Sequence, residues 1–408
     1  MPPKIAILAS LDTKGREAEF LRSAVAAQGC TPLIVDTGVL GEPAAAAEID
    51  RHRVAAAGGS SIAELIAGGD KTHALLVMAQ GAAALLLELL AKGELGGVLS
   101  VGGSRGTALS TRVMQALPVG VPKLMVSTMA SGENPFGPYT GTRDVTIMYS
   151  VADIQGLNAV TRTIFTNAAA AVCGMSRVGA PLRAGERPAL AASMLGVSTA
   201  LVSDIQQRVE ALGQELIAFH AVGPGGRSME ELIAAGLFCG VLDVTPGEIV
   251  QELVHSPFSA GPDRMKAAAA AALPQVCAPG GVDFIIHGPP DRLPPEYRQR
   301  KTMQHTPTIT LVRTSIEEMA QAGRIIAERL SASPAPAAMI LPLQAFGWFA
   351  MPGKPLHDPQ SDAAFIRAFK QHVAPRVEVV ELDTHLNDGR VAQTAVELMQ
   401  TMLKRGRG

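Results

Sequence analysis

The chain is 408 residues long, which favours two domains, because single hydrophobic cores rarely grow beyond about 250–300 residues. Hydrophobic residues make up 47% of it and charged residues 18%, which argues against large-scale disorder and suits helices packed on buried parallel sheets. The formal net charge is −2, and basic residues cluster only in the short tail from Lys404, so we expect no nucleic-acid partner.

The cysteines and the apolar segments indicate the compartment. Four cysteines stand far apart without a CxxC pair, so they suggest neither a zinc site nor a disulfide framework. The first ten residues lack the features of a secretory signal. The most apolar stretch, residues 74–91, is interrupted by Gln80, Gly81 and Glu88, which predicts a strand followed by a helix and no membrane span. We therefore expect a cytoplasmic protein with reduced thiols.

The first 180 residues alternate between strand-like and helix-like segments. Short apolar runs predict strands at residues 4–10, 31–36, 74–79, 97–101 and 123–127. Helical spacing of apolar residues predicts helices at residues 15–28, 61–67 and 153–174. The loop after the fifth strand is long and rich in Gly, Pro, Ser and Asn, which favours a functional loop.

A Gly-, Pro- and charge-rich segment, residues 175–188, predicts a linker, and we place the domain boundary there, between domains 1–180 and 181–408. After it, strands are predicted at residues 189–195, 215–221, 240–244, 282–287, 308–312, 338–342 and 377–382. Helices are predicted at residues 203–212, 228–235, 315–329, 362–372 and 389–404. This alternation predicts an α/β protein with two doubly wound parallel-sheet (Rossmann-like) domains and a cleft between them.

The strand at residues 97–101 leads directly into a glycine-rich loop and a helix-like segment. Glycine lets the backbone approach an anion closely, the N-terminus of the following helix favours negative charge, and Arg105 adds a bidentate cation. The predicted phosphate-type loop consists of Gly102, Gly103, Ser104, Arg105, Gly106 and Thr107. The alternative is an ordinary strand-to-helix turn with Arg105 in water, since neither Walker A nor GxGxxG is matched.

A polar cluster follows the first predicted strand. It contains Asp12, Thr13 and Lys14 and lies at the carboxyl edge of the strand, where open α/β sheets bind ligands. Lys14 is suited to a phosphate, and Asp12 to a metal or a ribose hydroxyl. The alternative is that Asp12 or Thr13 caps the next helix, which needs no ligand.

The loop at residues 127–144 offers further candidates. Thr128 and Ser131 follow a strand, Phe136 and Tyr139 present flat surfaces on which a base can stack, and Arg143 is an additional cation. The alternative is that the aromatic side chains pack the loop onto its own domain.

The second half contains a similar sequence, VGPGGRSM from Val222, which resembles VGGSRGT from Val101. Gly225, Gly226, Arg227 and Ser228 form the candidate site of this segment, with Ser228 also able to cap the following helix. If the similarity reflects duplication, each domain presents an anion loop and the ligand lies between them. Chance explains it equally well, and His220 just upstream is more typical of a hydrogen-bonded core residue than of a base.

Two other segments contain residue types that can act as a nucleophile or as metal ligands. Cys277 in CAPGGVD fits a small buried thiol better than a nucleophile, because no base stands beside it in the sequence. Near the end, Asp383, His385 and Asp388 could bind a divalent metal, but no strong ligand spacing such as HExxH is present.

Several motifs together carry a family resemblance. ILASLDTKG, SVGGSRGT, STMASGENPFGPY, FHAVGPGGRSMEEL, GVLDVTPGE and APGGVDF resemble the Tm-1-like ATP-binding family, bacterial proteins related to the amino-terminal inhibitory domain of a plant tobamovirus-resistance protein. The resemblance covers nearly the whole chain. It implies two α/β domains, ATP or a related nucleotide as ligand, and a homodimer. The resemblance does not identify any catalytic residue of this chain. We do not transfer to this chain either the virus inhibition by the plant protein or the activity of its barrel domain.

These observations predict a cytoplasmic two-domain protein that binds ATP, with or without magnesium, or another phosphorylated ligand. Lys14 and Arg227 are expected to neutralise the charge of that ligand. One alternative is a metabolic enzyme acting on a carboxylate or acyl substrate, in which Asp12 or His220 moves a proton. Another is a dimeric sensor or scaffold for a partner enzyme. The sequence leaves open whether any ligand is turned over, because phosphoryl transfer needs a positioned metal and nucleophile.

Overall fold

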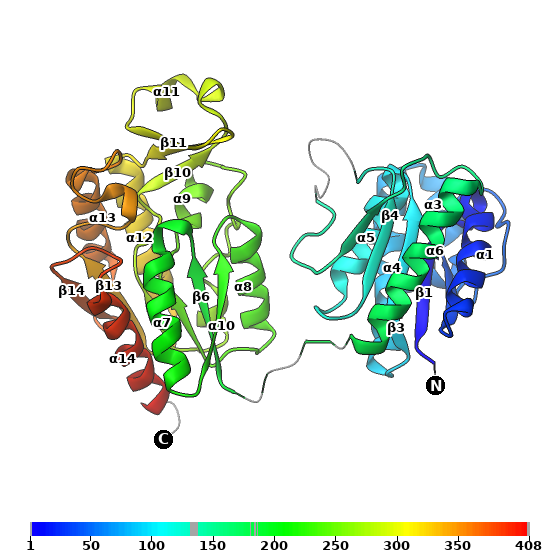
Figure 1. Cartoon of the computed structure of the whole chain (residues 1–408), viewed down its shortest axis with the longest axis horizontal. Coiled ribbons are helices and arrows are strands. Elements are labelled where there is room, and N and C mark those ends of the chain that lie inside the picture. The colour runs from blue at the N-terminus through cyan, green and yellow to red at the C-terminus, as the bar shows by residue number, and fades with distance from the viewer. Residues whose placement is uncertain (1, 131–137, 180, 183–184, 186, 406–408) are drawn as a thin grey trace. The chain divides into compact units, whose positions relative to one another are not determined.

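The computed structural model describes residues 2–130, 138–179, 181–182, 185 and 187–405. The chain divides into two compact units, Met1–Leu182 and Arg183–Gly408, which we call unit 1 and unit 2 (Figure 1). Each unit has its own parallel sheet with helices on both faces. The predicted fold class, two Rossmann-like α/β domains, is therefore confirmed.

Unit 1 is built on a five-stranded parallel sheet in the order β2-β1-β3-β4-β5. Its strands are β1 (Lys4–Ala9), β2 (Thr31–Asp36), β3 (Leu95–Gly102), β4 (Lys123–Ser127) and β5 (Thr146–Tyr149). Its helices are α1 (Leu11–Ala27), α2 (Arg51–Ala57), α3 (Ile62–Gly68), α4 (Lys71–Ala91), α5 (Ser104–Ala116) and α6 (Ala159–Val178).

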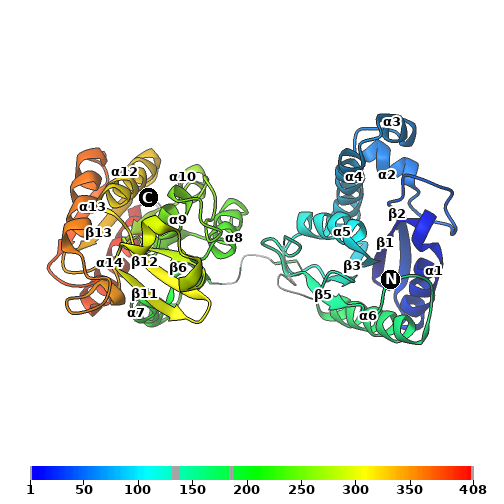
Figure 2. The ribbon, with the colours of Figure 1, turned by 90° about the horizontal axis from the view of Figure 1, so that it is seen from above.

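Two hydrophobic cores sandwich this sheet, because successive side chains of a strand point to opposite faces. Ile5 and Ile7 of β1 pack with α1 and α6. Ala6 and Leu8 pack with the layer formed by α2, α3, α4 and α5, and Figure 2 shows the two helical layers on either side of the strands. Burial on both faces explains why these strands appear in the sequence as continuous apolar runs.

The strand predicted at residues 74–79 is wrong, because this segment belongs to the 21-residue helix α4. The carboxylate of Asp70 caps the helix by accepting from the N–H groups of Thr72 and His73, and alanine and leucine favour helix throughout. Gly81 does not end the helix, since it is the position where α2 packs closely on α4. Among the described helices, α4 alone is long and apolar enough to cross a membrane, and half of its apolar window is buried inside the structure.

The other differences between the predicted and the observed elements of unit 1 concern short elements and the ends of helices. Helix α2 and strand β5 were not predicted. Helix α6 begins at Ala159 rather than at residue 153, because Asn158 forms a capping box with Thr161. Short elements of this kind carry little periodicity in the sequence.

Unit 2 is built on a six-stranded parallel sheet in the order β14-β13-β9-β8-β6-β7. Its strands are β6 (Ala189–Met194), β7 (Glu215–His220), β8 (Gly240–Asp243), β9 (Gln275–Cys277), β13 (Ala337–Pro342) and β14 (Glu378–Leu382). Helices α7 (Thr199–Ala211) and α14 (Gly389–Arg405) cover one face of the sheet. The other face is covered by α8 (Pro224–Ala234), α9 (Glu248–Leu253), α10 (Ala267–Ala270), α12 (Ile316–Ala332) and α13 (Pro359–His372).

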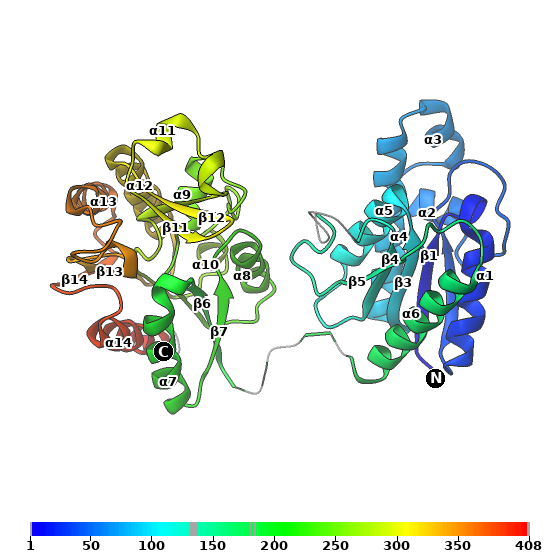
Figure 3. The same cartoon turned by 45° about the horizontal axis from the view of Figure 1, so that its top comes forward.

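Unit 2 also contains a small antiparallel sheet in the order β10-β12-β11, at one end of the unit (Figure 3). It consists of β10 (Phe284–His287), β11 (Thr302–Thr306) and β12 (Ile309–Arg313) and is accompanied by α11 (Pro295–Arg298). The short 3₁₀ helices are η1 (Gly196–Ser198), η2 (Pro290–Arg292) and η3 (Trp348–Ala350). The strands predicted at residues 282–287 and 308–312 therefore exist, but they do not join the parallel sheet. The tight connection between β11 and β12 is too short for a parallel crossover.

Candidate functional site

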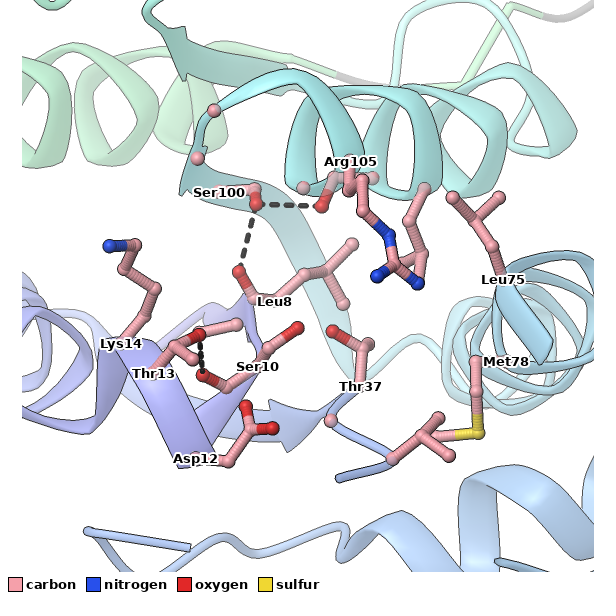
Figure 4. Close-up of a pocket in the computed structure, with 18 of the residues that line it drawn as sticks. Leu8, Ser10, Asp12, Thr13, Lys14, Thr37, Leu75, Met78, Ser100 and Arg105 are labelled. Atoms are coloured by element: carbon pink, nitrogen blue, oxygen red, sulfur yellow. Dashed lines mark hydrogen bonds between the residues drawn. The ribbon is translucent and has the colours of Figure 1, made fainter. Parts of the chain in front are cut away.

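The candidate site is a pocket of about 300 Å³ in unit 1, at the carboxyl ends of β1 and β3 (Figure 4). These two strands are neighbours in the sheet, but the chain continues from β1 to β2 on one side and from β3 to β4 on the other. The loops that leave the two strands therefore diverge and leave a crevice. Open α/β sheets bind their ligands at such a switch point of strand order.

Two helices begin at this pocket. Helix α1 starts at Leu11 and α5 starts at Ser104, and in each case one residue separates the helix from the preceding strand, β1 or β3. The first N–H groups of a helix have no partner within the helix, and neither Ser10 nor Gly103 caps them with a side chain. At α1, however, the N–H of Leu11 donates to Asp36, and the helix is kinked at Lys14. Helix α5 is therefore the one that presents uncapped donors and the positive end of a dipole to the pocket.

Glycine is required at the start of α5 for packing. A Cβ at Gly102 would lie 2.9 Å from the Cα of Gly106, closer than real side chains pack. The two glycines therefore let the end of β3 meet the first turn of α5. This contact gives the glycines a role in the strand-to-helix turn, as the alternative interpretation of the sequence has it. It also leaves the N-terminus of α5 open on the pocket side.

Two cations line the pocket on opposite sides (Figure 4). Arg105 is exposed and donates one long hydrogen bond, 3.4 Å, from Nη2 to the carbonyl of Lys71 at the start of α4. The Nζ of Lys14 donates to the carbonyl of Ile154. An ammonium group has three donors and a guanidinium five, so both side chains retain capacity to bind an anion.

Asp12 lines the α1 side of the pocket, and the buried Asp36, which does not line it, lies close by; we call these two carboxylates the acidic corner. Asp36 accepts from the backbone N–H groups of Leu11, at 3.0 Å, and Gly38, at 2.8 Å. Burial raises the pKa of the Asp36 carboxyl, and the nearby Asp12 also raises it. Oδ1 of Asp12 is buried and has no hydrogen-bond partner among the described residues. This atom is the least satisfied polar group of the pocket.

An apolar wall completes the pocket. It is lined by Leu75 and Met78 of α4 (Figure 4), by Val39 and Leu40 of the loop after β2, and by Leu109 of α5. The sequence pointed to the glycine loop and to the Asp12 cluster, but it missed this wall. The reason is that residues 74–79 were predicted to be a sheet strand.

The predicted hydroxyl residues of unit 1 have different environments. Thr107 is buried, and its Oγ1 lies 2.7 Å from Oγ of Ser127, so it holds α5 to β4. Thr13 is exposed and donates to the carbonyl of Ser10 at 3.3 Å. Ser104 is exposed as the first residue of α5. Thr128 lies beside the loop, with Oγ1 3.7 Å from where a Cβ of Gly103 would be.

Ser131 and Phe136 lie outside the described residues. The described part of their loop is attached to neighbouring segments of unit 1. Nε2 of Gln115 donates to the carbonyl of Tyr139 at 2.7 Å, and Nε of Arg143 donates to the carbonyl of Leu117 at 3.2 Å. These bonds attach the backbone of the loop at Tyr139 and the side chain of Arg143 to unit 1.

The candidate loop of unit 2 already holds a carboxylate of the protein. The N–H groups of Gly223 and Gly226, at the start of α8, both donate to Oε1 of Glu248, at 2.5 and 3.2 Å. A Cβ at Gly226 would lie 2.0 Å from Oε2 of the same side chain. The helix N-terminus that was predicted to bind a ligand anion is thus occupied from within.

The other predicted residues of this loop make local contacts. Arg227 is exposed and donates to the carbonyl of Ser259 at 3.0 Å, and Oγ of Ser228 donates to the carbonyl of Pro224 at 2.9 Å. The backbone of Gly225 approaches His220 so closely that a Cβ would lie 1.8 Å from the His220 carbonyl oxygen. The hydrogen bonds of the Arg227 guanidinium and the Ser228 hydroxyl therefore go to backbone carbonyls of unit 2.

Glu248 belongs to a buried charge cluster that sequence reasoning missed. The guanidinium of Arg264 is fully buried and donates to Glu248 at 2.7 Å, to both oxygens of Asp243 at 2.6 and 2.7 Å, and to Glu230 at 3.1 Å. Burial raises the pKa of the Glu248 carboxyl, although Arg264 opposes this. The available signal was the presence of Asp243 and Glu248 within an otherwise apolar segment.

The remaining candidates of unit 2 have structural environments. Cys277 is completely buried, and burial raises the pKa of its thiol, which leaves it unreactive. Hydrogen bonds from Arg390 and Thr384 lower the pKa of the Asp388 carboxyl. Within the described ranges, no group of three or more His, Cys, Asp or Glu side chains is placed to hold a metal ion.

Asp283 provides a prediction on stability. Both of its carboxylate oxygens are buried without a hydrogen-bond partner among the described residues, and Arg313 lies 3.7 Å away. Burial raises its pKa from 3.8 to about 6. The native state therefore holds this proton more tightly than the unfolded state, and stability falls as pH rises from about 4 to about 6. We expect Asp283→Asn to stabilise unit 2 by about 1–3 kcal/mol at pH 7.5.

Urea denaturation at pH 7.5 and pH 4 measures this effect. The gain should largely disappear at pH 4, where both forms of the native protein are neutral at this position. The exposed Asp291→Asn serves as the matched control and should change little at either pH. A variant of Asp283 that loses stability equally at both pH values would contradict the prediction.

Both halves of the chain match models of the Uncharacterised protein family (UPF0261): the N-terminal domain model matches residues 3–181 and the C-terminal domain model residues 187–403. A UPF0261 protein of Clostridium tetani is 38% identical over 406 residues, 99% of this chain and 100% of that protein. One of Rhizobium meliloti is 36% identical over 395 residues, 96% of this chain and 97% of that protein.

Two further similarities are less extensive. The ToMV resistance protein Tm-1(GCR237) of Solanum lycopersicum is 33% identical over 313 residues, which are 74% of this chain and 41% of that protein. The crystal structure of Methanocaldococcus jannaschii UDP-GlcNAc 2-epimerase in complex with UDP-GlcNAc and UDP covers 98% of this chain and 100% of its own, at 9% identity and a TM-score of 0.20. That structural likeness is too weak to support an argument.

Proposed function

The chain belongs to the UPF0261 family, and we propose that its unit 1 binds a phosphorylated ligand in the pocket between β1 and β3. The observation that carries the proposal is the uncapped N-terminus of α5, which opens with Arg105 on a pocket at a switch point of strand order. Such a place favours an anion. The resemblance to Tm-1-like ATP-binding proteins makes ATP or a related nucleotide the first candidate.

The parts of a nucleotide match the parts of the pocket. Phosphates belong at the N-terminus of α5, where Gly102 and Gly103 leave the backbone accessible and Arg105 adds positive charge. The base belongs against Leu75 and Met78, because an apolar wall accepts a flat ring without unpaired polar groups. The volume of about 300 Å³ lies at the lower end of small-molecule sites.

Three further proposals rest on composition and on the family resemblance. Magnesium accompanies ATP and is bound mainly by phosphates and water, as is usual for this ion. The protein is a cytoplasmic homodimer. The proposed ATP pocket is lined by residues of unit 1 alone. A test of ATP binding therefore does not depend on whether the protein is a dimer.

Arg105→Ala provides the test of the proposed function. We expect its affinity for ATP to fall about 10-fold to 100-fold, the range for losing a hydrogen bond to a charged group. The measurement is isothermal titration calorimetry with ATP, with and without magnesium. Arg112→Ala is the matched control, because Arg112 is an exposed arginine of the same helix outside the pocket. Equal affinities of all three proteins would remove the α5 loop, and no binding by the wild type would overturn the proposal.

A further inference from the structure

We infer that Asp12 is the specificity-determining residue of this pocket and that it accepts a hydrogen bond from a ribose hydroxyl of the ligand. The inference rests on the proposed function and names the part of the ligand that unit 1 distinguishes. It predicts a preference for ribonucleotides over their deoxy counterparts.

The first argument is the unsatisfied oxygen of Asp12. Oδ1 is buried and has no hydrogen-bond partner among the described residues, although the side chain lines the pocket. A buried acceptor without a partner is unfavourable, and a ligand that supplies a donor removes this cost. A hydroxyl group is such a donor, whereas a phosphate oxygen would repel the carboxylate.

The second argument is that the loop after β2 fixes the position of this carboxylate. A Cβ at Gly38 would lie 3.1 Å from Oδ1 of Asp12, and a Cβ at Gly41 would lie 3.3 Å from the Asp12 Cβ. The loop therefore packs directly against both ends of the side chain at two glycines. An acceptor held in this way is already oriented for a ligand before binding.

The third argument is that the nearest alternative acceptor is already used. Dinucleotide-binding folds commonly use an acidic residue at the end of the second strand for the ribose. Here that residue is Asp36, the last residue of β2, and its Oδ1 accepts from both Leu11 N and Gly38 N. Asp12, the second residue of α1, lies beside it and lines the pocket, and its carboxylate makes no hydrogen bond to a described residue.

The polarity of the pocket sets the orientation of the ligand. Asp12 places negative charge on the α1 side, where the Nζ of Lys14 donates to the carbonyl of Ile154, while Arg105 lies on the opposite side of the space, at the start of α5 (Figure 4). Phosphates are attracted to α5 and repelled by the acidic corner. The sugar is therefore the part that reaches Asp12.

The test compares ATP, 2′-deoxy-ATP and 3′-deoxy-ATP by calorimetry in the presence of EDTA. Wild-type protein should bind ATP about 10-fold to 100-fold more tightly than at least one deoxy analogue, because a site built for a hydroxyl rejects the analogue lacking it. Asp12→Ala should bind all three nucleotides with similar affinity. Glu19→Ala, an exposed acidic position of the same helix, should keep the wild-type preference.

Each outcome decides a separate point. If wild-type protein binds ATP and both deoxy analogues equally, or if Asp12→Ala keeps the preference, the inference is overturned while nucleotide binding stands. If magnesium strengthens ATP binding only when Asp12 is present and the deoxy ratio stays unchanged, Asp12 is a metal ligand and the inference is again overturned. If no nucleotide binds the wild type, the proposed function fails as well. Asp12→Asn and a far-UV circular dichroism spectrum guard against misfolding of the alanine variant.

Discussion

Replacing Arg264 with methionine is expected to destabilise unit 2 by about 3–5 kcal/mol, the cost of removing one partner from a buried ion pair. The Arg264 guanidinium is fully buried and neutralises Asp243 and Glu248, which are also fully buried, and Glu230, which is nearly so. Methionine fills much of the same volume, so the loss is one of charge rather than of packing. Asp243 and Glu248 would then lose the cation that they share. Because whole domains are stable by only about 5–15 kcal/mol, much of the variant is expected to be unfolded.

The measurement is urea unfolding followed by circular dichroism, with the transition of unit 2 identified by the fluorescence of Trp348, the only tryptophan of the chain. Lys266→Met is the matched control. Lys266 lies two positions after Arg264 in the chain, and it is an exposed cation that pairs with Asp263. Its effect should stay within about 0.5 kcal/mol. A wild-type transition for Arg264→Met would show that the cluster does not support the unit.

The cluster also explains why the second glycine loop resembles a ligand site in the sequence. Glycines followed by arginine at a strand exit create the same helix N-terminus in both units. In unit 2 the anion is Glu248, which lies more than twenty residues further along the chain and reaches Gly223 and Gly226 only in the folded state. Sequence spacing does not indicate that contact, so the two loops could not be distinguished before the fold was known.

The fold class could be predicted because each unit is dominated by strands buried on both faces. The apolar runs of β1, β2 and β3 are unambiguous, and helix α1 between β1 and β2 shows regular apolar spacing. The order of the strands in the sheet could not be predicted in the same way, because it depends on which helices cover which face. The neighbouring positions of β1 and β3, which bring Asp12 and Arg105 to one pocket, were therefore a finding of the structure.

The main error in the fold lies in α4, where apolar residues surround the helix on most sides and the amphipathic period is weak. A short apolar run bounded by a glycine is compatible with a strand or with a buried helix. Gly81 resembles a break in the apolar run, but in the structure it is a packing position within α4. A Cβ there would lie 1.9 Å from the carbonyl oxygen of Val54 and 2.8 Å from the N of Gly58, both at the α2 side of the contact.

Gly81→Ala is accordingly expected to destabilise unit 1 by about 2–3 kcal/mol, although alanine is the better helix former. The methyl group would meet backbone atoms, which cannot rotate away, so α2 and α4 must separate. Gly174→Ala is the matched control, because a Cβ at Gly174, within helix α6, meets nothing within 4 Å. That variant should gain up to about 1 kcal/mol. Urea unfolding of the two proteins should therefore give shifts of opposite sign.

The same pair of variants connects the packing of α4 with the pocket. Leu75 and Met78 lie on α4 in the two turns before Gly81 and form the apolar wall. If α4 moves away from α2, this wall moves with it, so Gly81→Ala should also weaken ATP binding, whereas Gly174→Ala should leave it unchanged. Calorimetry at a temperature where both variants are folded measures this. Wild-type affinity in a destabilised Gly81→Ala protein would show that the wall does not contact the ligand, and the base would then have to bind elsewhere in unit 1.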